Sequence, residues 1–216
     1  MSITSRLNDL GVTLPDAPAP AANYVPFVKT GNTVYVSGQI SNGPDGFITG
    51  KLGADMDVAA GAEAAKTCAI SLLAQVKAAC DGDIERLKRV VKLTAFVNST
   101  ADFTDQPKVV NGASDFLVEA LGDAGRHARS AVSAASLPLG VAVEIEGIFE
   151  IECPYHRRFI RPLLRIAVFI TAMPVGPKTA LPPFRPRLIG AMASSLMCNC
   201  HAMVWRWCFT TMRWIA

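Results

Sequence analysis

One arginine and three glutamates lie in the apolar stretch HARSAVSAASLPLGVAVEIEGIFEI, residues 127–151, and their types suit specific chemistry. A planar guanidinium such as that of Arg129 can hold a carboxylate through two parallel hydrogen bonds, which a lysine cannot do. A glutamate carboxylate can orient a water molecule or accept a proton. Arg129 could equally form a structural ion pair with Glu144 or Glu146, so the stretch by itself leaves both interpretations open.

Two predicted strands position these side chains. Residues 130–135 and 141–152 have strand character, and Leu-Pro-Leu-Gly separates them. Alternation in the second strand places Val141, Val143, Ile145, Phe149 and Ile151 on one face, and Glu144, Glu146, Glu150 and Glu152 on the other. We expect the two strands to be neighbours, so that the Leu-Pro turn brings Arg129 and Glu144 together.

The first part of the chain predicts a hairpin, a loop and a long helix. Two apolar runs in YVPFVKTGNTVYVSGQI flank Thr30-Gly31-Asn32, which is typical of a β-hairpin, and NGPDG at 42–46 indicates a loop. Asp57 can cap a helix that extends to about Ala79. The apolar stripe of that helix consists of Ala65, Ala69, Leu72, Val76 and Ala79.

A buried strand at 90–97 and a second helix at 107–121 follow. The order ββαβαββ predicts an α+β sandwich, with two helices on one face of a mixed sheet. The other face carries charge together with Ile148 and Ala142. A half-apolar face of this kind favours burial against another subunit.

Composition divides the chain near residue 153. Residues 1–153 hold 12 basic and 18 acidic residues, a net charge of −6, whereas residues 154–216 hold 9 basic residues and no acid. We therefore expect one domain at 1–153. At 154–216 we expect an extension that is disordered or is the product of a frameshift or gene-model error. Its Cys198-Asn-Cys200-His201 run lacks a second ligand pair at a recognised spacing, so no metal site is predicted.

The sequence predicts a cytoplasmic protein. MSITSRLNDLG has no apolar core of the length that a secretory signal needs. Cys68 and Cys80 fall in a helical pattern and are interpreted as buried small hydrophobes rather than parts of a disulfide framework. The apolar run at 163–176 is too short to span a membrane and contains Arg165, so no membrane partner is expected.

The motifs YVSGQI, FVNSTADF, ARSAV, LP and VEIEGI, in this order over about residues 5–152, resemble the RidA/YjgF family. These proteins are imine deaminases, and older members were called L-PSP-type endoribonucleases. The resemblance implies a chorismate-mutase-like fold and a homotrimer with ligand clefts between subunits. The chain also resembles a branch of the family with a longer N-terminus, through the runs RLNDLGVTLPDAPAPAANYVP and VNGASDF.

The resemblance also implies an activity and the residues that perform it. Family members hydrolyse small 2-imino acids to 2-keto acids and ammonia without a cofactor. Arg129 matches the arginine that binds the substrate carboxylate, and Glu144 matches the glutamate that orients water or shuttles a proton. Tyr24 matches a cleft tyrosine and Asn111 an asparagine at the cleft edge. The family often has cysteine two positions after the arginine, where this chain has Ala131.

Two other functions stay open. The same cleft could hold a small carboxylate without turnover, as a binding module. An endoribonuclease acting on single-stranded RNA is disfavoured, because a domain with a net charge of −6 repels phosphate. At the level of residues, Glu144 could form an inter-subunit salt bridge, Tyr24 could serve packing, Asn111 could bond the backbone, and His127 could line the cleft.

Overall fold

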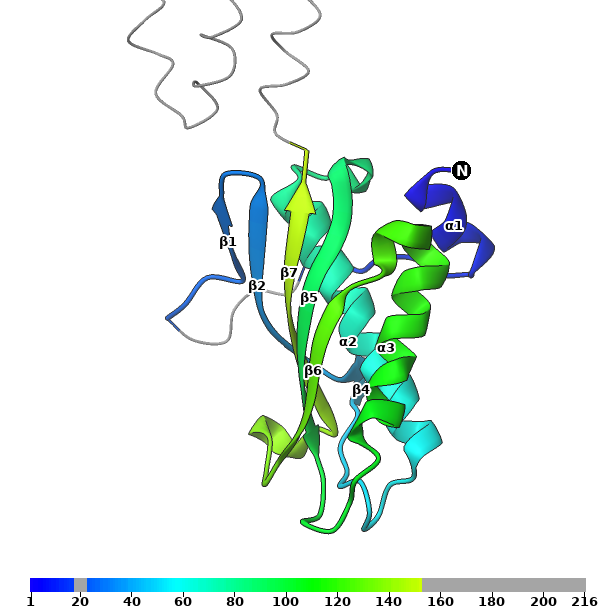
Figure 1. The fold of residues 1–216 in the computed structure, drawn as a ribbon, viewed down its shortest axis with the longest axis vertical. Coiled ribbons are helices and arrows are strands. Elements are labelled where there is room, and N and C mark those ends of the chain that lie inside the picture. The colour runs from blue at the N-terminus through cyan, green and yellow to red at the C-terminus, as the bar shows by residue number, and fades with distance from the viewer. Residues whose placement is uncertain (18–22, 153–216) are drawn as a thin grey trace, which may run out of the picture. The chain divides into compact units, whose positions relative to one another are not determined.

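A computed structural model describes residues 1–17 and 23–152 (Figure 1). The predicted extension at 154–216, with its cysteine and histidine residues, lies outside the described residues. In the part of the chain that is described, no helix is both long and apolar enough to cross a membrane.

A five-stranded mixed sheet forms one layer of the fold, and two long helices cover one of its faces (Figure 1). The strands are β1 (Phe27–Thr30), β2 (Thr33–Ile40), β5 (Leu87–Asn98), β6 (Ala128–Ala134) and β7 (Val143–Ile151), in the spatial order β1-β2-β7-β5-β6. Only β5 and β6 run parallel. The helices are α2 (Val58–Ala79) and α3 (Gln106–Leu121). The predicted α+β order ββαβαββ is therefore confirmed.

Short elements complete this frame. They are the helix α1 (Ile3–Asp9), the strands β3 (Asn42–Gly43) and β4 (Gly46–Phe47), and the 3-10 turns η1 (Ile84–Arg86), η2 (Gly122–Gly125) and η3 (Pro138–Gly140). The strands β3 and β4 pair with each other at the predicted 42–46 loop. Helix α1 was not predicted from the sequence.

Helix α2 forms where its cap and its apolar residues indicated. The Asp57 carboxylate accepts a hydrogen bond of 2.8 Å from the N–H of Ala60 and so caps the first turn. All five residues of the predicted stripe are fully buried, and so is Cys68, as expected. Burial extends around the helix through Leu73 and Ala74, because α2 packs against both the sheet and α3.

The expected pairing of the last two strands is wrong. β5 lies between β6 and β7, pairing in parallel with β6 and antiparallel with β7. Helix α3 supplies the crossover between β5 and β6 that two parallel strands need. The Leu-Pro segment then carries the chain past β5 through η3, instead of making a hairpin.

The alternation of β7 is confirmed. Val143, Ile145, Phe149 and Ile151 are buried, whereas Glu146 and Glu150 are exposed. Ala142, expected on the charged face, is instead fully buried in the core. It precedes β7, and its N–H donates to the carbonyl of Ile48.

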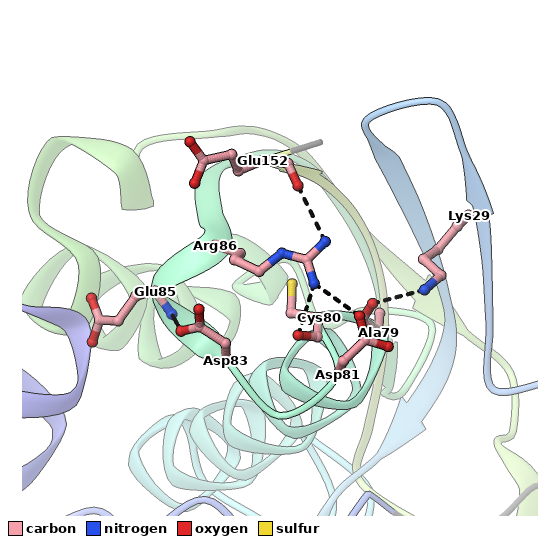
Figure 2. Close-up of polar contacts among 8 residues, drawn as sticks. All are labelled: Lys29, Ala79, Cys80, Asp81, Asp83, Glu85, Arg86 and Glu152. Carbon is pink, nitrogen blue, oxygen red and sulfur yellow. Dashed lines mark hydrogen bonds and ion pairs between the residues drawn. The ribbon is translucent and has the colours of Figure 1, made fainter. Parts of the chain in front are cut away.

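Two basic side chains, Arg86 and Lys29, bind the C-terminal end of α2 (Figure 2). Arg86 donates to the Cys80 carbonyl at 3.0 Å, to the Asp81 carboxylate at 2.9 Å and to the Glu152 carbonyl at 3.3 Å. Lys29 donates to the Ala79 carbonyl at 3.0 Å. These contacts satisfy carbonyls that the end of a helix leaves without intrahelical partners, and they hold the segment after β7 against α2.

Candidate functional site

Arg129 lies on the edge strand β6 and is held by helix α3. Its Nη1 donates to the Ser114 hydroxyl at 2.9 Å, and its Nη2 donates to the Asn111 Oδ1 at 2.8 Å and to the Pro107 carbonyl at 3.1 Å. The three acceptors are three and four residues apart on α3 and therefore share one face of the helix. The structure thus brings together two of the predicted site residues, Arg129 and Asn111.

No edge of the Arg129 guanidinium is free to bind a carboxylate through two hydrogen bonds. A guanidinium offers a carboxylate either its Nε and Nη2 hydrogens or its Nη1 and Nη2 hydrogens. Both Nη2 hydrogens of Arg129 are engaged, by Asn111 and by Pro107. A ligand that binds through two parallel bonds must therefore replace one of these acceptors. Asn111 accepts through its side chain, which can rotate away, whereas Pro107 accepts through its backbone carbonyl, which the helix holds in place.

His127 extends this group of polar contacts. Its Nδ1 lies 2.6 Å from the Gly125 carbonyl and its Nε2 lies 3.1 Å from the Ser114 hydroxyl. Burial lowers the pKa of His127; the bond to Gly125 opposes this shift, and the positive charge of Arg129 adds to it. His127 therefore touches Ser114, the residue whose hydroxyl accepts a hydrogen bond from Arg129.

Glu144 occupies a place on β7 that a glycine makes available. An added Cβ at Gly38 on β2 would collide with the Glu144 carboxylate, so the carboxyl group lies directly over Gly38. Burial raises the pKa of Glu144, and the nearby charge of Glu146 raises it further. The SGQI and VEIE motifs are therefore linked in space, because the first leaves room for the glutamate of the second.

Glu144 and Arg129 lie on opposite faces of the sheet within one chain. Arg129 reaches α3 and so points to the helix-covered face. Glu144 lies between the buried residues Val143 and Ile145 and so points to the open face. The expected direct approach of the two side chains is therefore wrong within one chain, and in the described ranges no salt bridge joins Arg129 to Glu144 or Glu146.

Tyr24 is also far from Arg129 in the topology. It precedes β1, at one edge of the sheet, whereas Arg129 lies on β6 at the other edge. The Tyr24 side chain is half exposed. One chain thus places Arg129 and Asn111 at one position and Glu144 and Tyr24 elsewhere.

The open face of the sheet is half apolar, as expected. Val28, Tyr35 and Val132 expose 52%, 46% and 45% of their surface. Val28 pairs with Tyr35, which pairs with Ile148 across β2 and β7. Glu144 shares this face, in register with Phe96 of β5.

Ser114 and Gly38 were not among the predicted site residues. Ser114 lies three residues after Asn111, so a search for polar residues on one helical face could have found it. Gly38 carried a signal too, because a glycine inside a strand often marks a close approach by another group.

Comparison with known proteins gives a consistent result. The family model described as "YjgF/chorismate mutase-like, putative endoribonuclease" matches residues 4–149. Protein TCP17 of Trypanosoma cruzi is 48% identical over 151 residues, which are 69% of this chain and 94% of that protein. The crystal structure of Atu1372, a protein of unknown function from Agrobacterium tumefaciens, is 50% identical with a TM-score of 0.65, and the match covers 69% of this chain and 92% of that one.

One further relative has a name that states a reaction. The 2-iminobutanoate/2-iminopropanoate deaminase of Dermatophagoides farinae is 29% identical over 143 residues, which are 65% of this chain and 95% of that protein. The family match at residues 4–149 falls on the part of the chain that holds the sheet and both long helices. From its fold, its motifs and these relatives, the chain belongs to the YjgF/RidA family and has that family's chorismate-mutase-like fold.

Proposed function

We propose that this protein hydrolyses small 2-imino acids, or their enamine tautomers, to 2-keto acids and ammonia. The observation that carries the proposal is the guanidinium of Arg129, which helix α3 holds beside the exposed Asn111. A guanidinium fixed in this way suits the carboxylate that every 2-imino acid carries. The reaction named for the Dermatophagoides farinae relative supports the same substrate class.

Carboxylate binding sets the orientation of the imine. The substrate carboxylate takes over an Nη2 hydrogen of Arg129 as Asn111 turns away, while Ser114 keeps its bond to Nη1. With two bonds formed, the imine carbon, which is attached directly to the carboxylate, has a fixed position. Holding a reactant in this way removes much of the entropic cost of attack by water.

Glu144 is the proposed partner of the water. Water adds to the imine carbon, a proton reaches the nitrogen, and the C–N bond of the resulting carbinolamine breaks to give the keto acid and ammonia. The raised pKa of Glu144 suits a group that accepts a proton from water and returns it to the leaving nitrogen. A protonated imine is itself electrophilic, so the proposed step uses no cofactor.

The proposed site is completed by a second copy of the chain. Arg129 and Asn111 lie on the helix side of one sheet edge, whereas Glu144 lies on the open face. A homotrimer that buries the half-apolar open face would bring Glu144 and Tyr24 of one subunit to Arg129 of its neighbour. The exposed Val28, Tyr35 and Val132 support burial of this face.

A carboxylate-binding module without turnover is the second candidate. It is favoured by the separation of Arg129 from Glu144 in one chain, since a lone subunit has a binding arginine without the proposed water partner. Endoribonuclease activity, which the family description includes, has less support. The described domain carries more acidic than basic residues, and affinity for RNA is mainly electrostatic.

One coupled assay separates these functions. A dehydratase generates 2-iminobutanoate or 2-aminoacrylate in the presence of this protein, and release of the keto acid is followed with time. Hydrolysis by the protein predicts faster release, which Arg129→Ala and Glu144→Gln should each abolish. Binding of 2-ketobutyrate without acceleration would favour the binding module, and full activity of Arg129→Ala would refute the site. RNA cleavage is tested with Arg129→Ala and a mock-purified control.

A further inference from the structure

A continuous series of hydrogen bonds links His127 to Arg129. The Gly125 carbonyl lies 2.6 Å from His127 Nδ1, Ser114 Oγ lies 3.1 Å from His127 Nε2, and Arg129 Nη1 donates to the same Oγ at 2.9 Å. The Gly125 residue belongs to η2, Ser114 to α3, and Arg129 to β6. The series therefore links three elements through His127 and the Ser114 hydroxyl.

The chemistry of the partners determines where each proton lies. A carbonyl only accepts, so the proton of His127 resides on Nδ1 and points to Gly125. The Nε2 of a neutral imidazole is then an acceptor, and it accepts a hydrogen bond from the Ser114 hydroxyl. The oxygen of Ser114 keeps its lone pairs for Arg129, so each group is satisfied in one consistent direction.

Protonation of His127 would break this arrangement. Nε2–H would then be a donor aimed at the Ser114 oxygen, and the hydroxyl proton would lose its acceptor. A second positive charge would also face Arg129 across one serine. The charged residues on α3, on η2 and between η2 and Arg129 are Lys108, Asp115 and Glu119 on α3, Asp123 within η2, Arg126 directly after η2, and Arg129 itself. Lys108 pairs with Asp105 at 3.0 Å. Asp123 and Arg126 pair with each other at 3.3 Å, and Asp115 and Glu119 are exposed, so they do not replace the lost acceptor.

We propose that His127 and Ser114 are positioning residues for Arg129, and that neutral His127 keeps the arginine in its carboxylate-binding orientation while protonated His127 releases it. The anchor at Nη1 matters because the ligand must exchange partners at Nη2. While Ser114 holds Nη1, the guanidinium keeps its plane during that exchange. This inference rests on the proposed function for its effect on binding, but the coupling of the two side chains can be measured without a ligand.

The ligand-independent test is nuclear magnetic resonance of the full-length protein labelled with ¹⁵N. Spectra of the imidazole nitrogens should show His127 with its proton on Nδ1 at neutral pH. The Arg129 Nε–H signal, identified by its loss in Arg129→Lys, should shift with the same midpoint as His127 when the pH is lowered. Ser114→Ala should uncouple the two signals. A proton on Nε2, or an Arg129 signal that is indifferent to His127 or still coupled in Ser114→Ala, would overturn the proposal.

The ligand-dependent test is calorimetric titration with 2-ketobutyrate between about pH 5 and pH 8. Binding should weaken by about tenfold on the acid side, the value of one hydrogen bond to a charged group. His127→Gln offers an amide oxygen to Ser114 and cannot titrate, so it should flatten this profile, whereas His127→Ala should bind weakly at every pH. An unchanged pH profile in His127→Gln would contradict the inference. Failure of the wild-type protein to bind 2-ketobutyrate would instead count against the proposed function, and the spectra would still decide on the coupling.

Discussion

At the scale of single residues, Arg129 uses the same N–H groups to bind helix α3 and the proposed ligand. Its three bonds to α3 hold β6 and α3 together, and a hydrogen bond to a charged group contributes about 1.5–3 kcal/mol. A ligand carboxylate gains less binding free energy than a full bidentate contact would give, because it must displace Asn111. The affinity for the ligand therefore depends on how well Asn111 competes.

Asn111→Asp tests this competition. A carboxylate at position 111 would hold the Arg129 Nη2 hydrogens as an ion pair and block the substrate carboxylate. We expect the dissociation constant for 2-ketobutyrate to rise by at least about tenfold. The melting temperature should stay the same or rise slightly, because an exposed ion pair contributes about 0–1 kcal/mol.

Asn111→Ala is the matched control for this substitution. It removes the amide without adding a charge, so any direct contact of Asn111 with the ligand is lost in both variants. The difference between the Asp and Ala variants in calorimetric titration isolates the competition. Equal affinities of the two variants would show that Asn111 does not compete with the ligand.

We expect the ionised form of Glu144 to lower the stability of the folded protein, and this effect depends on pH. Its pKa is raised in the folded chain, so its contribution to stability is fully present below about pH 4.5 and is lost as the pH rises through the folded value. Glu144→Gln removes the charge that burial disfavours. The variant should therefore melt higher than the wild type at pH 7 and at the same temperature below about pH 4.

Thermal unfolding between pH 3.5 and pH 8 measures this difference. Glu150→Gln, at an exposed position of the same strand, controls for the loss of one negative charge. A gain in melting temperature that is equal for both variants, or that is independent of pH, would argue against burial as the cause. The coupled keto-acid assay should show that the more stable Glu144→Gln protein is inactive.

At the scale of elements, periodicity predicted what is local and missed what is not. The stripe of α2 and the alternation of β7 follow from residue spacing, and both are present. The order of strands does not follow from spacing: β6 pairs with β5 because α3 returns the chain in parallel, so the Leu-Pro turn could not be read as a hairpin. The partners of Arg129 depend on that strand order. Arg129 therefore bonds Asn111 and Ser114 within the chain, and not the glutamates of β7.

Gly112 provides a prediction about the packing of α3 on α2. A Cβ at this position would collide with the backbone carbonyl of Ala62 in α2, which cannot move as a flexible side chain would. Replacing glycine by alanine inside a helix ordinarily stabilises a protein by about 0.5–1 kcal/mol. Here Gly112→Ala should instead destabilise by about 1–3 kcal/mol, because the helices must separate.

Chemical denaturation measures this change. Gly43→Ala is the control, because a Cβ there would make only ordinary contacts with Ile48. Since Gly112 follows Asn111, the displaced helix should also weaken the bonds to Arg129 and lower the affinity for 2-ketobutyrate. A Gly112→Ala variant as stable as the wild type would mean that α3 can shift without cost.

At the scale of the whole molecule, the end of the last strand is held against α2, and the open face of the sheet has no partner among the described residues. Arg86 both donates to the Glu152 carbonyl and accepts from its N–H, at 3.3 Å and 2.7 Å, which secures the end of the last strand against α2 (Figure 2). We propose that the domain ends here, as the change in composition near residue 153 predicts. The open face, with Tyr35 and Val132, is then the surface available to a second copy.

Subunit mixing tests whether a second copy completes the site. Arg129→Ala and Glu144→Gln chains should each be inactive alone in the coupled assay. If the arginine and the glutamate of one site come from different subunits, trimers reassembled from an equal mixture contain both native residues at about one site in four, because each is present in half of the chains. Activity should therefore recover to about a quarter of the wild-type value. If both residues act from the same chain, no mixed trimer has an intact site, and the absence of recovery after verified exchange would refute the shared site.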